Sequence, residues 1–377
     1  GNSHGAIDID GKVYSNSDLD VDAMNTNGST SSTVTARGDC GSWINGRSVN
    51  FLNQCGTVNQ SDTNDRDPDY GQPTLPGTTK TVPNCPGGGG ARVVDLDPGR
   101  YTDRNKLNTL SGGTTSCQNV VLHFKPGIYY FDLGGTWSIG TSRNGYVIGG
   151  TLAGDFNASS PKLPGSCLPP VPGNDPEDWV DPGPDAGVEF VLSDDTQLEV
   201  GNNGGMELCG TYHENSPPIA LYGQKTNSNT CVNRTPYPTG SSTCAILRTT
   251  PNNTSGGNNY SSGKVIVQGT AYLPNGAVDL KVNNANQVLF EDGLIVRTLR
   301  LAAKTSTGST PTVMLPSSSG GGPVRTVVDL TVYACPSTDP GRCGKVALSV
   351  RVGLTDANTH PTAGARQVTV YNWTNPR

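Results

Sequence analysis

The sequence predicts an all-β protein: a parallel β-solenoid (β-helix-like) body with long Gly-, Pro- and Asn-rich loops and disulfide bonds, followed by a C-terminal antiparallel β-hairpin or small sheet. Three observations support this fold. The 49 glycines and 28 prolines make up about a fifth of the chain, against a usual share of about 12%. Short runs of branched and aromatic residues, such as "GVEFVLSDDTQLEV", alternate with turn-forming clusters. Two turn-and-strand patterns also recur, so we expect a folded, turn-rich chain.

The recurring patterns indicate repeated structural units. "GKVYSNSDLDVDAMNT" (11–26) and "GTAYLPNGAVDLKVNN" (269–284) both open with glycine, place a tyrosine three positions later and end in alternating apolar and polar residues. "DLDPGRYTD" (95–103) and "HFKPGIYYFD" (123–132) share a Pro-Gly turn followed by a tyrosine. In a solenoid these stretches are equivalent segments of stacked coils. The alternative is unrelated hairpin arms that share turn chemistry.

Residues 1–325 are predicted as the solenoid body. The spacing from Gly269 to Gly293 is 24 residues, within the usual repeat length of about 20 to 50 residues. Helical periodicity is confined to "RNKLNTL" (104–110) and "LRLAAK" (299–304), each long enough for a turn or two. Three segments are too long for simple connectors and are predicted as loop insertions: about residues 56–92, 157–186 and 225–263.

Residues 326–377 are predicted as a separate antiparallel β module. The runs "RTVVDLTVYAC", "CGKVALSVRVGLTD" and "RQVTVYNWTN" are longer than the strands predicted upstream, and they alternate apolar with polar residues. Loops join them, and the predicted Cys335–Cys343 bridge would close one of these loops. We expect this module to cap the body or to form a second domain.

The cysteine pattern predicts structural disulfides. The chain has ten cysteines, an even number, and no pair shows the CxxC spacing of a zinc or redox centre. Disulfides in turn indicate an oxidising compartment outside the cytoplasm. Sequence does not fix the connectivity, but neighbouring cysteines suggest Cys40–Cys55, Cys85–Cys117, Cys167–Cys209, Cys231–Cys244 and Cys335–Cys343.

Charge and hydropathy exclude several kinds of partner. The net charge is −6, and no basic block could follow a phosphate backbone, so nucleic acid is excluded as a partner. No apolar stretch reaches the roughly 20 residues that span a bilayer. The opening "GNSHGAIDID" lacks the basic and apolar regions of a signal peptide. We therefore expect a soluble chain that is extracellular or at the cell surface.

Several phrases occur in a characteristic order over most of the chain. They include "GAIDIDGKVYSNSDLDVD", "VDLDPGRYTD", "LHFKPGIYYFDLGGTWSIG", "VIVQGTAYLPNGAVDLKVNN" and the closing "RQVTVYNWTNPR". In these phrases the chain resembles the extracellular part of actinobacterial tight-adherence (TadG-like) pilus-assembly and cell-surface proteins. The resemblance implies a secreted or envelope-attached structural protein with no enzymatic activity and no active-site residues. Members of that family typically begin with a membrane-anchoring helix, which this sequence lacks, so the mode of attachment does not follow from the resemblance.

Residues with catalytic potential are few. "SDLDVD" places Asp18, Asp20 and Asp22 on one face of a strand, and "IDID" does the same with Asp8 and Asp10. Such a row could line a saccharide groove or hold a cation; the alternative is a solvated outward face. The four histidines lie in no known nucleophile or metalloprotease motif. The sequence therefore predicts no catalytic residues.

One acidic loop, "SDTNDRDPDYG" (61–71), is a candidate calcium site. Ca²⁺ takes about six to eight oxygen ligands, and alternating Asp and Asn residues are how many loops supply them. The order departs from the EF-hand pattern, because the glycine comes late and no Glu closes the loop. The alternative is a solvated acidic loop. The five oxygen-bearing residues are Asp62, Asn64, Asp65, Asp67 and Asp69.

These observations favour a non-enzymatic structural protein that forms part of an extracellular filament, pilus or cell-surface layer. Its partners would be further copies of the same chain or other surface proteins. Two alternatives stay open. One is an adhesin or carbohydrate-binding protein that contacts glycans through exposed Trp43, Trp137 and Trp179. The other is a β-helix polysaccharide lyase or hydrolase that uses Asp18 and Asp20.

Overall fold

The structure is a computed structural model, and it divides into two compact units, Gly1–Leu315 and Pro316–Arg377. Strands dominate, and α1 (Arg104–Leu110) is the single helix among the described residues. No described helix is long and apolar enough to cross a membrane. The described residues are 7–10, 13–15, 24–26, 34–36, 56–57, 70–87, 90–168, 187–193, 195–213, 216–224, 245–250, 261–283, 287–290, 293–303, 312–314, 324–334, 345–356 and 366–374.

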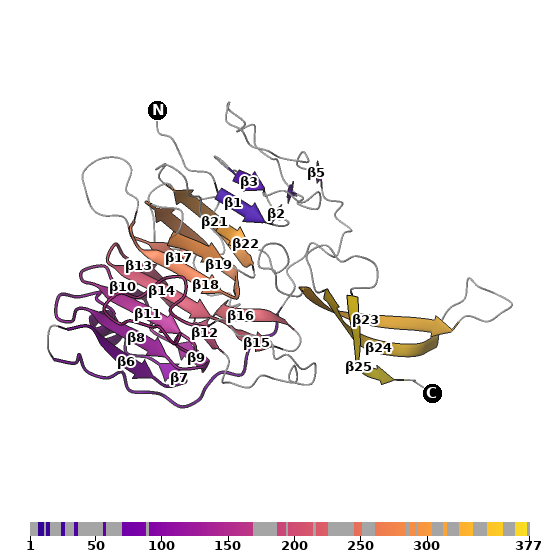
Figure 1. The fold of residues 1–377 in the computed structure, drawn as a ribbon, viewed down its shortest axis with the longest axis horizontal. Coiled ribbons are helices and arrows are strands. Elements are labelled where there is room, and N and C mark those ends of the chain that lie inside the picture. The colour runs from indigo at the N-terminus through magenta and orange to yellow at the C-terminus, as the bar shows by residue number, and fades with distance from the viewer. Residues whose placement is uncertain are drawn as a thin grey trace, which may run out of the picture. The chain divides into compact units, whose positions relative to one another are not determined.

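The first unit contains a nine-stranded sheet in which every strand runs parallel to its neighbours. Its two outer strands, β3 and β6, lie at opposite ends of the sheet (Figure 1). In spatial order the strands are β3 (Met24–Thr26), β1 (Ile7–Asp10), β22 (Thr312–Met314), β20 (Val288–Phe290), β18 (Lys264–Gln268), β14 (Gly204–Cys209), β11 (Gly145–Gly149), β8 (Val120–Phe124) and β6 (Arg92–Leu96).

A ten-stranded sheet lies against the first and is also parallel, apart from the antiparallel pair β15 and β16. Its long strands β19 and β21 each pair along two successive stretches. The strands are β7 (Gly99–Tyr101), β9 (Gly127–Phe131), β10 (Thr136–Ile139), β12 (Val188–Leu192), β13 (Gln197–Val200), β15 (Thr211–His213), β16 (Ser216–Gly223), β17 (Ala245–Thr249), β19 (Thr270–Val282) and β21 (Leu294–Ala303).

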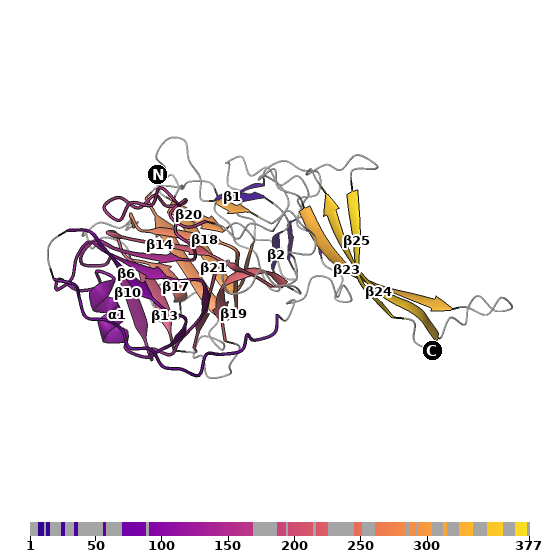
Figure 2. The same ribbon diagram turned by 60° about the horizontal axis from the view of Figure 1, so that its bottom comes forward.

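From β6 to β22 the chain passes back and forth between the two sheets, as Figures 1 and 2 show. After each strand of the nine-stranded sheet it contributes to the ten-stranded sheet, and it then returns to a neighbouring place in the first. Register is kept between neighbours: Val94 lies beside Leu122, Leu122 beside Val147, and Val147 beside Met206. Residues of the same kind therefore form rows across the sheet.

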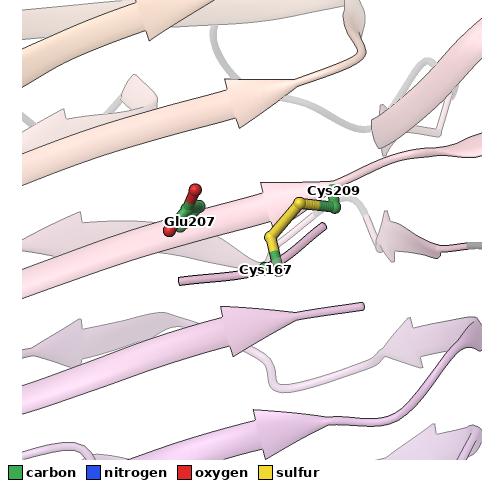
Figure 3. Close-up of side chains that lie close together, drawn as sticks. All are labelled: Cys167, Glu207 and Cys209. Atoms are coloured by element: carbon green, nitrogen blue, oxygen red, sulfur yellow. A yellow bond between two sulfur atoms is a disulfide. The ribbon is translucent and has the colours of Figure 1, made fainter. Parts of the chain in front are cut away.

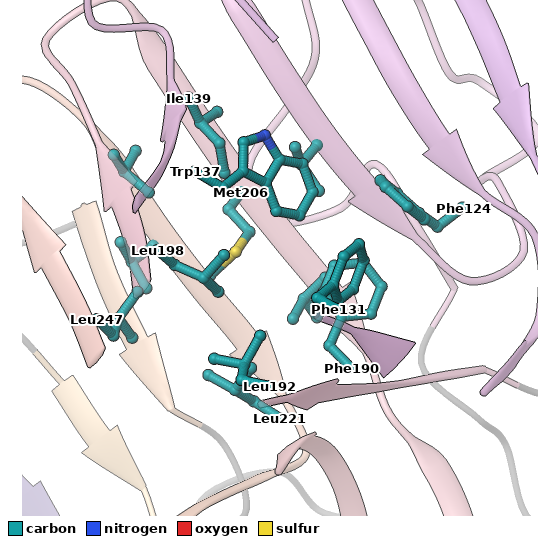
Figure 4. Packing of buried hydrophobic residues seen from close by; sticks show 14 of the residues in the cluster. Phe124, Phe131, Trp137, Ile139, Phe190, Leu192, Leu198, Met206, Leu221 and Leu247 are labelled. Atoms are coloured by element: carbon teal, nitrogen blue, oxygen red, sulfur yellow. The ribbon is translucent and has the colours of Figure 1, made fainter. Parts of the chain in front are cut away.

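The main core fills the space between the sheets. Phe124, Phe131, Trp137 and Phe190 are fully buried there and meet ring to ring, with Phe124 and Phe190 centroids 4.8 Å apart (Figure 4). Trp137 also donates a 3.0 Å hydrogen bond from Nε1 to Ser111 Oγ, so its one polar atom is satisfied. Large aromatic rings at in-register positions thus supply much of the buried apolar area of the first unit.

The recurring Pro-Gly turns are two neighbouring, nearly identical structures. Gly99 and Gly127 both adopt positive φ (155° and 137°), and a Cβ on Gly127 would lie 2.4 Å from Pro98 Cγ, so the second turn stacks directly on the first. The tyrosine of each motif braces its own turn: Tyr101 donates to Asp97 O at 2.7 Å, and Tyr129 donates to Lys125 O at 2.6 Å. The repeated sequence therefore encodes a turn and its brace.

We expect Tyr129→Phe to lower the free energy of unfolding by about 1 to 3 kcal/mol, because Lys125 O loses its hydroxyl donor and Leu96 O keeps only the N–H of Lys125. The matched control is Tyr130→Phe, since the neighbouring Tyr130 is only half-buried and bonds to the Gln224 side chain at 3.3 Å. Denaturant unfolding of the three proteins measures both effects. Equal stabilities for the two variants would contradict the role of the Tyr129 brace.

Helix α1 covers the open edge of strand β10. The Asn108 side chain imitates a strand: its Oδ1 accepts from Ser138 N at 2.7 Å, and its Nδ2 donates to Thr136 O at 3.4 Å. Ser111 continues the pairing, because its Oγ donates to Ser138 O at 2.8 Å and its carbonyl accepts from Gly140 N at 2.7 Å. The helix predicted over residues 104–110 is thus confirmed. Its residues form hydrogen bonds with backbone N–H and C=O groups of β10 that an uncovered edge strand would leave without a protein partner.

The helical turn predicted over residues 299–304 is wrong. Residues up to Ala303 belong to β21, which pairs in parallel with β19. Leu299 and Leu301 lie beside Val278 and Leu280, so the alternation of apolar residues was the relevant signal. Pairing with a neighbouring strand outweighs the helix propensity of Leu, Arg and Ala here.

Two smaller sheets complete the described strands. One is parallel and consists of β2 (Val13–Ser15), β4 (Val34–Ala36) and β5 (Gly56–Thr57). Tyr14 of "GKVY" and Tyr272 of "GTAY" thus lie in different sheets, on β2 and β19, but each of these strands is the next described strand after one of the nine-stranded sheet. In the second unit, β23 (Val324–Ala334), β24 (Lys345–Asp356) and β25 (Arg366–Thr374) form an antiparallel sheet, as predicted.

Candidate functional site

The structure places few of the predicted site residues. Asp8 and Asp10 lie on β1, where only the backbone is described, and Asp18, Asp20 and Asp22 lie outside the described residues. Both aspartate rows therefore stay predictions. The calcium loop also stays a prediction, because its five residues fall outside the described part of the chain: Asp62, Asn64, Asp65, Asp67 and Asp69.

Two predicted disulfides are confirmed. Cys85 is bonded to Cys117, and Cys167 is bonded to Cys209. The first joins the segment before β6 to the loop before β8, and the second joins the loop after β11 to the end of β14. The other six cysteines lie outside the described residues: Cys40, Cys55, Cys231, Cys244, Cys335 and Cys343.

Segment 150–168 covers the outer face of the nine-stranded sheet. Val121, Ile148 and Ile266 point outward from β8, β11 and β18, and they are fully buried in a second apolar cluster beneath this segment. Leu163 and the Cys167–Cys209 disulfide belong to the same cluster. Segment 150–168 is therefore packed onto the sheet rather than projecting from it.

Glu207 is the polar centre of this covered face and was not anticipated from the sequence. Its side chain points outward from β14 toward segment 150–168 (Figure 3). Oε1 accepts from Gly165 N and from Gln268 Nε2, both at 2.6 Å, and Oε2 accepts from Ser166 N at 2.8 Å. A further backbone N–H, that of Cys167, also acts on the carboxylate. Burial raises the pKa of Glu207, and these hydrogen bonds oppose the rise only in part.

The cluster of Cys167, Glu207 and Cys209 has the donor set of a metal site, since one ligand atom from each residue lies within 4.8 Å of the others. The chemistry argues otherwise. Both sulfurs are joined in a disulfide (Figure 3), and thiolates rather than disulfides bind metals. The carboxylate oxygens already accept hydrogen bonds from the segment. Glu207 thus fixes segment 150–168 to the sheet.

We expect Glu207→Gln to lower the free energy of unfolding at pH 7 by about 1 to 3 kcal/mol, because one amide N–H₂ would then face a backbone N–H that needs an acceptor. The control is Asp155→Asn in the same segment, which removes an exposed pair with Lys162 and should cost at most about 1 kcal/mol. Thermal and denaturant unfolding give both values.

The comparison of wild type with Glu207→Gln also predicts a pH dependence of stability. Because the pKa of Glu207 is raised on folding, the folded state binds its proton more readily than the unfolded state. This contribution to stability is fully present below the unfolded value of 4.5 and is lost as pH rises through the folded pKa. The stability difference between wild type and Glu207→Gln should therefore widen as pH falls toward 4.5. A difference that does not change with pH would contradict the buried titration.

His123 lies on the same outer face and has no free nitrogen for catalysis. Its Nδ1 lies 2.8 Å from Asp95 Oδ1 on β6, and its Nε2 lies 2.9 Å from Gly150 O. Each ring nitrogen is therefore occupied by a contact to a neighbouring element. His123 is a strand residue of β8, as its position before "FKPG" indicates, and it ties β6 to the start of segment 150–168.

Glu199 and Arg248 form an ion pair on the outer side of β13 and β17. Arg248 Nη2 donates to Glu199 Oε2 at 2.8 Å, and both side chains are less than a fifth exposed (18% and 14% for Arg248 and Glu199). Thr250 Oγ1 donates to the other carboxylate oxygen. Glu199 on β13, Arg248 on β17 and Asp279 on β19 lie side by side in register. Charges of opposite sign therefore alternate across these three neighbouring strands. This arrangement favours the observed register of the strands.

The tryptophan hypothesis is wrong at one of its three positions. Trp137 is fully buried in the core, so it cannot contact a glycan. Trp43 and Trp179 lie outside the described residues. One half-buried aromatic residue is Tyr130 on β9 of the ten-stranded sheet, which has the Arg100 guanidinium 5.8 Å from its ring centroid. Period-2 alternation places Trp137 and Ile139 on one side of β10, which was the sequence signal for burial.

Comparison of the chain with protein-family models, with curated proteins and with solved structures finds no match in any of the three.

Proposed function

We propose that the first unit is a parallel β-solenoid. Three features support this: the chain alternates between two parallel sheets, neighbouring strands keep their register, and equivalent turns repeat. Gly269 and Gly293 both adopt positive φ (147° and 98°), and each lies between a strand of the nine-stranded sheet and a strand of the ten-stranded sheet. The stacked Pro-Gly turns at Gly99 and Gly127 occupy the same place in two successive coils.

On this architecture the chain would be a secreted structural protein, a building block or component of an extracellular filament, pilus or cell-surface layer, and not an enzyme. One observation carries the proposal. All nine strands of the nine-stranded sheet run in the same direction, so its outer strands β3 and β6 match in sense and could continue the sheet from copy to copy. The ionisable groups Glu207, His123 and Glu199 are meanwhile engaged in contacts that hold the fold.

The proposed location is extracellular or at the cell surface. Cys85–Cys117 and Cys167–Cys209 fit an oxidising compartment, where such bonds persist. The order of sequence phrases that resembles TadG-like surface proteins points in the same direction. On this reading its partners are further copies of the chain or other surface proteins.

The test is whether the purified full chain assembles. Negative-stain electron microscopy and sedimentation velocity, at rising protein concentration and with and without reductant, should show regular assemblies in the oxidised sample. Reductant should weaken them, because the disulfides hold segments of the body in place. Dispersed monomers under all conditions would count against the structural role.

A glycan-binding role is the second candidate, and one observation favours it. Half-buried Tyr130 lies beside Arg100, which forms a 2.5 Å ion pair with Asp132. An aromatic face flanked by charged hydrogen-bonding groups is a common way to hold a sugar ring. Glycan-array binding that is lost in Tyr130→Ala, without any assembly, would favour this role over the structural one.

A further inference from the structure

The end of the first unit formed by β6, β7 and β10 is protected unevenly. Strand β10 is covered by α1, as described above. Strand β7 is covered by residues 78–80: Arg100 N donates to Thr78 O at 2.9 Å, and Lys80 N donates to Arg100 O at 2.8 Å. Strand β6 pairs with β8 alone among the described strands.

The backbone of β6 presents hydrogen-bonding groups on its outer side. Arg92 N donates to Asn119 O, and Leu96 O accepts from Lys125 N, both at 3.1 Å. In a parallel ladder alternate residues bond to the same neighbour, so Arg92, Val94 and Leu96 face β8. The N–H and C=O groups of Val93 and Asp95 therefore face away from it. In the described part of the chain no backbone hydrogen bond reaches these two residues from the outer side.

The side chain of Val93 is also left uncovered. It lies in register with Val121 and, through Val121, with Tyr146. Val121 is fully buried under segment 150–168, whereas Val93 is 40% exposed, one of the few exposed large apolar residues among those described. The row of Val93, Val121 and Tyr146 thus ends at the edge strand β6 with Val93 partly exposed.

We propose that β6 is the surface on which a second copy of this chain docks, through that copy's strand β3. The inference rests on the proposed structural function and deepens it. Strand β3 is the opposite edge of the same nine-stranded sheet and pairs only with β1 among the described strands. Since β3 and β6 run in the same direction, a copy shifted along the stacking direction would present β3 as a parallel neighbour to β6.

This contact joins unlike edges and so repeats without closing. Each copy would offer β6 to one neighbour and β3 to another, which generates a filament rather than a ring or a two-fold dimer. Main-chain hydrogen bonds from Val93 and Asp95 would supply the attachment, and burial of Val93 would add apolar area. The covered strands β7 and β10 restrict this kind of pairing to one strand at that end.

The decisive variant is Val93→Pro. It removes an N–H that points away from β8, so it leaves the β6–β8 hydrogen bonds in place, and edge strands tolerate proline. Val93→Lys tests the same edge while keeping the backbone N–H, because a charged edge residue discourages strand addition. Leu168→Lys is the matched control, since Leu168 is 47% exposed and its N–H bonds to Thr151 O within segment 150–168 rather than to an edge strand.

The full chain and its variants are compared by sedimentation velocity and electron microscopy, with thermal unfolding as a check on the fold. We expect Val93→Pro and Val93→Lys to raise the concentration at which assembly begins about tenfold or more, and Leu168→Lys to leave it unchanged. If wild type assembles and both Val93 variants assemble equally well, the β6 inference is wrong while the structural function stands. If wild type does not assemble at all, both fall.

Discussion

Replacing Trp137 with alanine is expected to lower the free energy of unfolding by about 3 to 5 kcal/mol, the largest effect of a single substitution that the structure predicts. Trp137 is fully buried and packs against Phe124, Phe131 and Phe190. Its removal would leave a cavity in a row of in-register rings, which neighbouring strands cannot close without losing their own pairing. Chemical denaturation gives the value directly.

Two comparisons separate the causes of that loss. Trp137→Phe keeps most of the apolar volume but loses the N–H that bonds to Ser111, and Ser111→Ala removes this bond together with the bond from Ser111 Oγ to Ser138 O. Both should cost less than Trp137→Ala. If Trp137→Ala kept full stability but lost binding to glycans, the result would contradict the burial of Trp137 and favour an exposed, glycan-binding tryptophan.

The second large effect is expected for the double variant Cys167→Ala, Cys209→Ala, which should lose about 2 to 5 kcal/mol of stability. The bond closes 42 residues of chain, against 32 for Cys85–Cys117, so chain entropy alone predicts similar losses for the two bonds. Cys167–Cys209 has an additional role, because it holds the segment whose backbone N–H groups bind Glu207.

That additional role is measurable as a coupling. Glu207→Gln should cost less in the Cys167→Ala, Cys209→Ala background than in wild type, because the segment that supplies its hydrogen bonds is no longer fixed. In the Cys85→Ala, Cys117→Ala background Glu207→Gln should cost the same as in wild type. Full additivity in both backgrounds would show that Glu207 and the Cys167–Cys209 bond act independently.

Turns, helices and strands that depend on a single short motif could be predicted from the sequence. The Pro-Gly turns and the helix at residues 104–110 could be predicted because each depends on residues close in the chain. The pairs Cys85–Cys117 and Cys167–Cys209 could be predicted because cysteines that are neighbours in chain order are bonded to each other. The alternating runs of the C-terminal strands likewise predicted their antiparallel pairing.

The contacts that were missed depend on residues far apart in sequence. Glu207 in "MELCG" looks like an ordinary strand residue, and its partners at Gly165 and Ser166 are supplied by a loop that has no motif. Asn108 is part of a short helix in the sequence, yet it works as a surrogate strand for β10. Only the topology brings such groups together, so spacing along the chain carries no signal for them.

The nine-stranded sheet also has a consequence for the order of events during synthesis. Strand β1 precedes the other described strands of this sheet in the chain but pairs with β22, where Asp8 lies beside Thr312. That pairing can form only after nearly the whole first unit has emerged, whereas the pairs from β6 to β22 link neighbouring parts of the chain and can form progressively. A nascent chain that stops before residue 312 must therefore leave β1 without its β22 partner, so this part of the sheet is completed late.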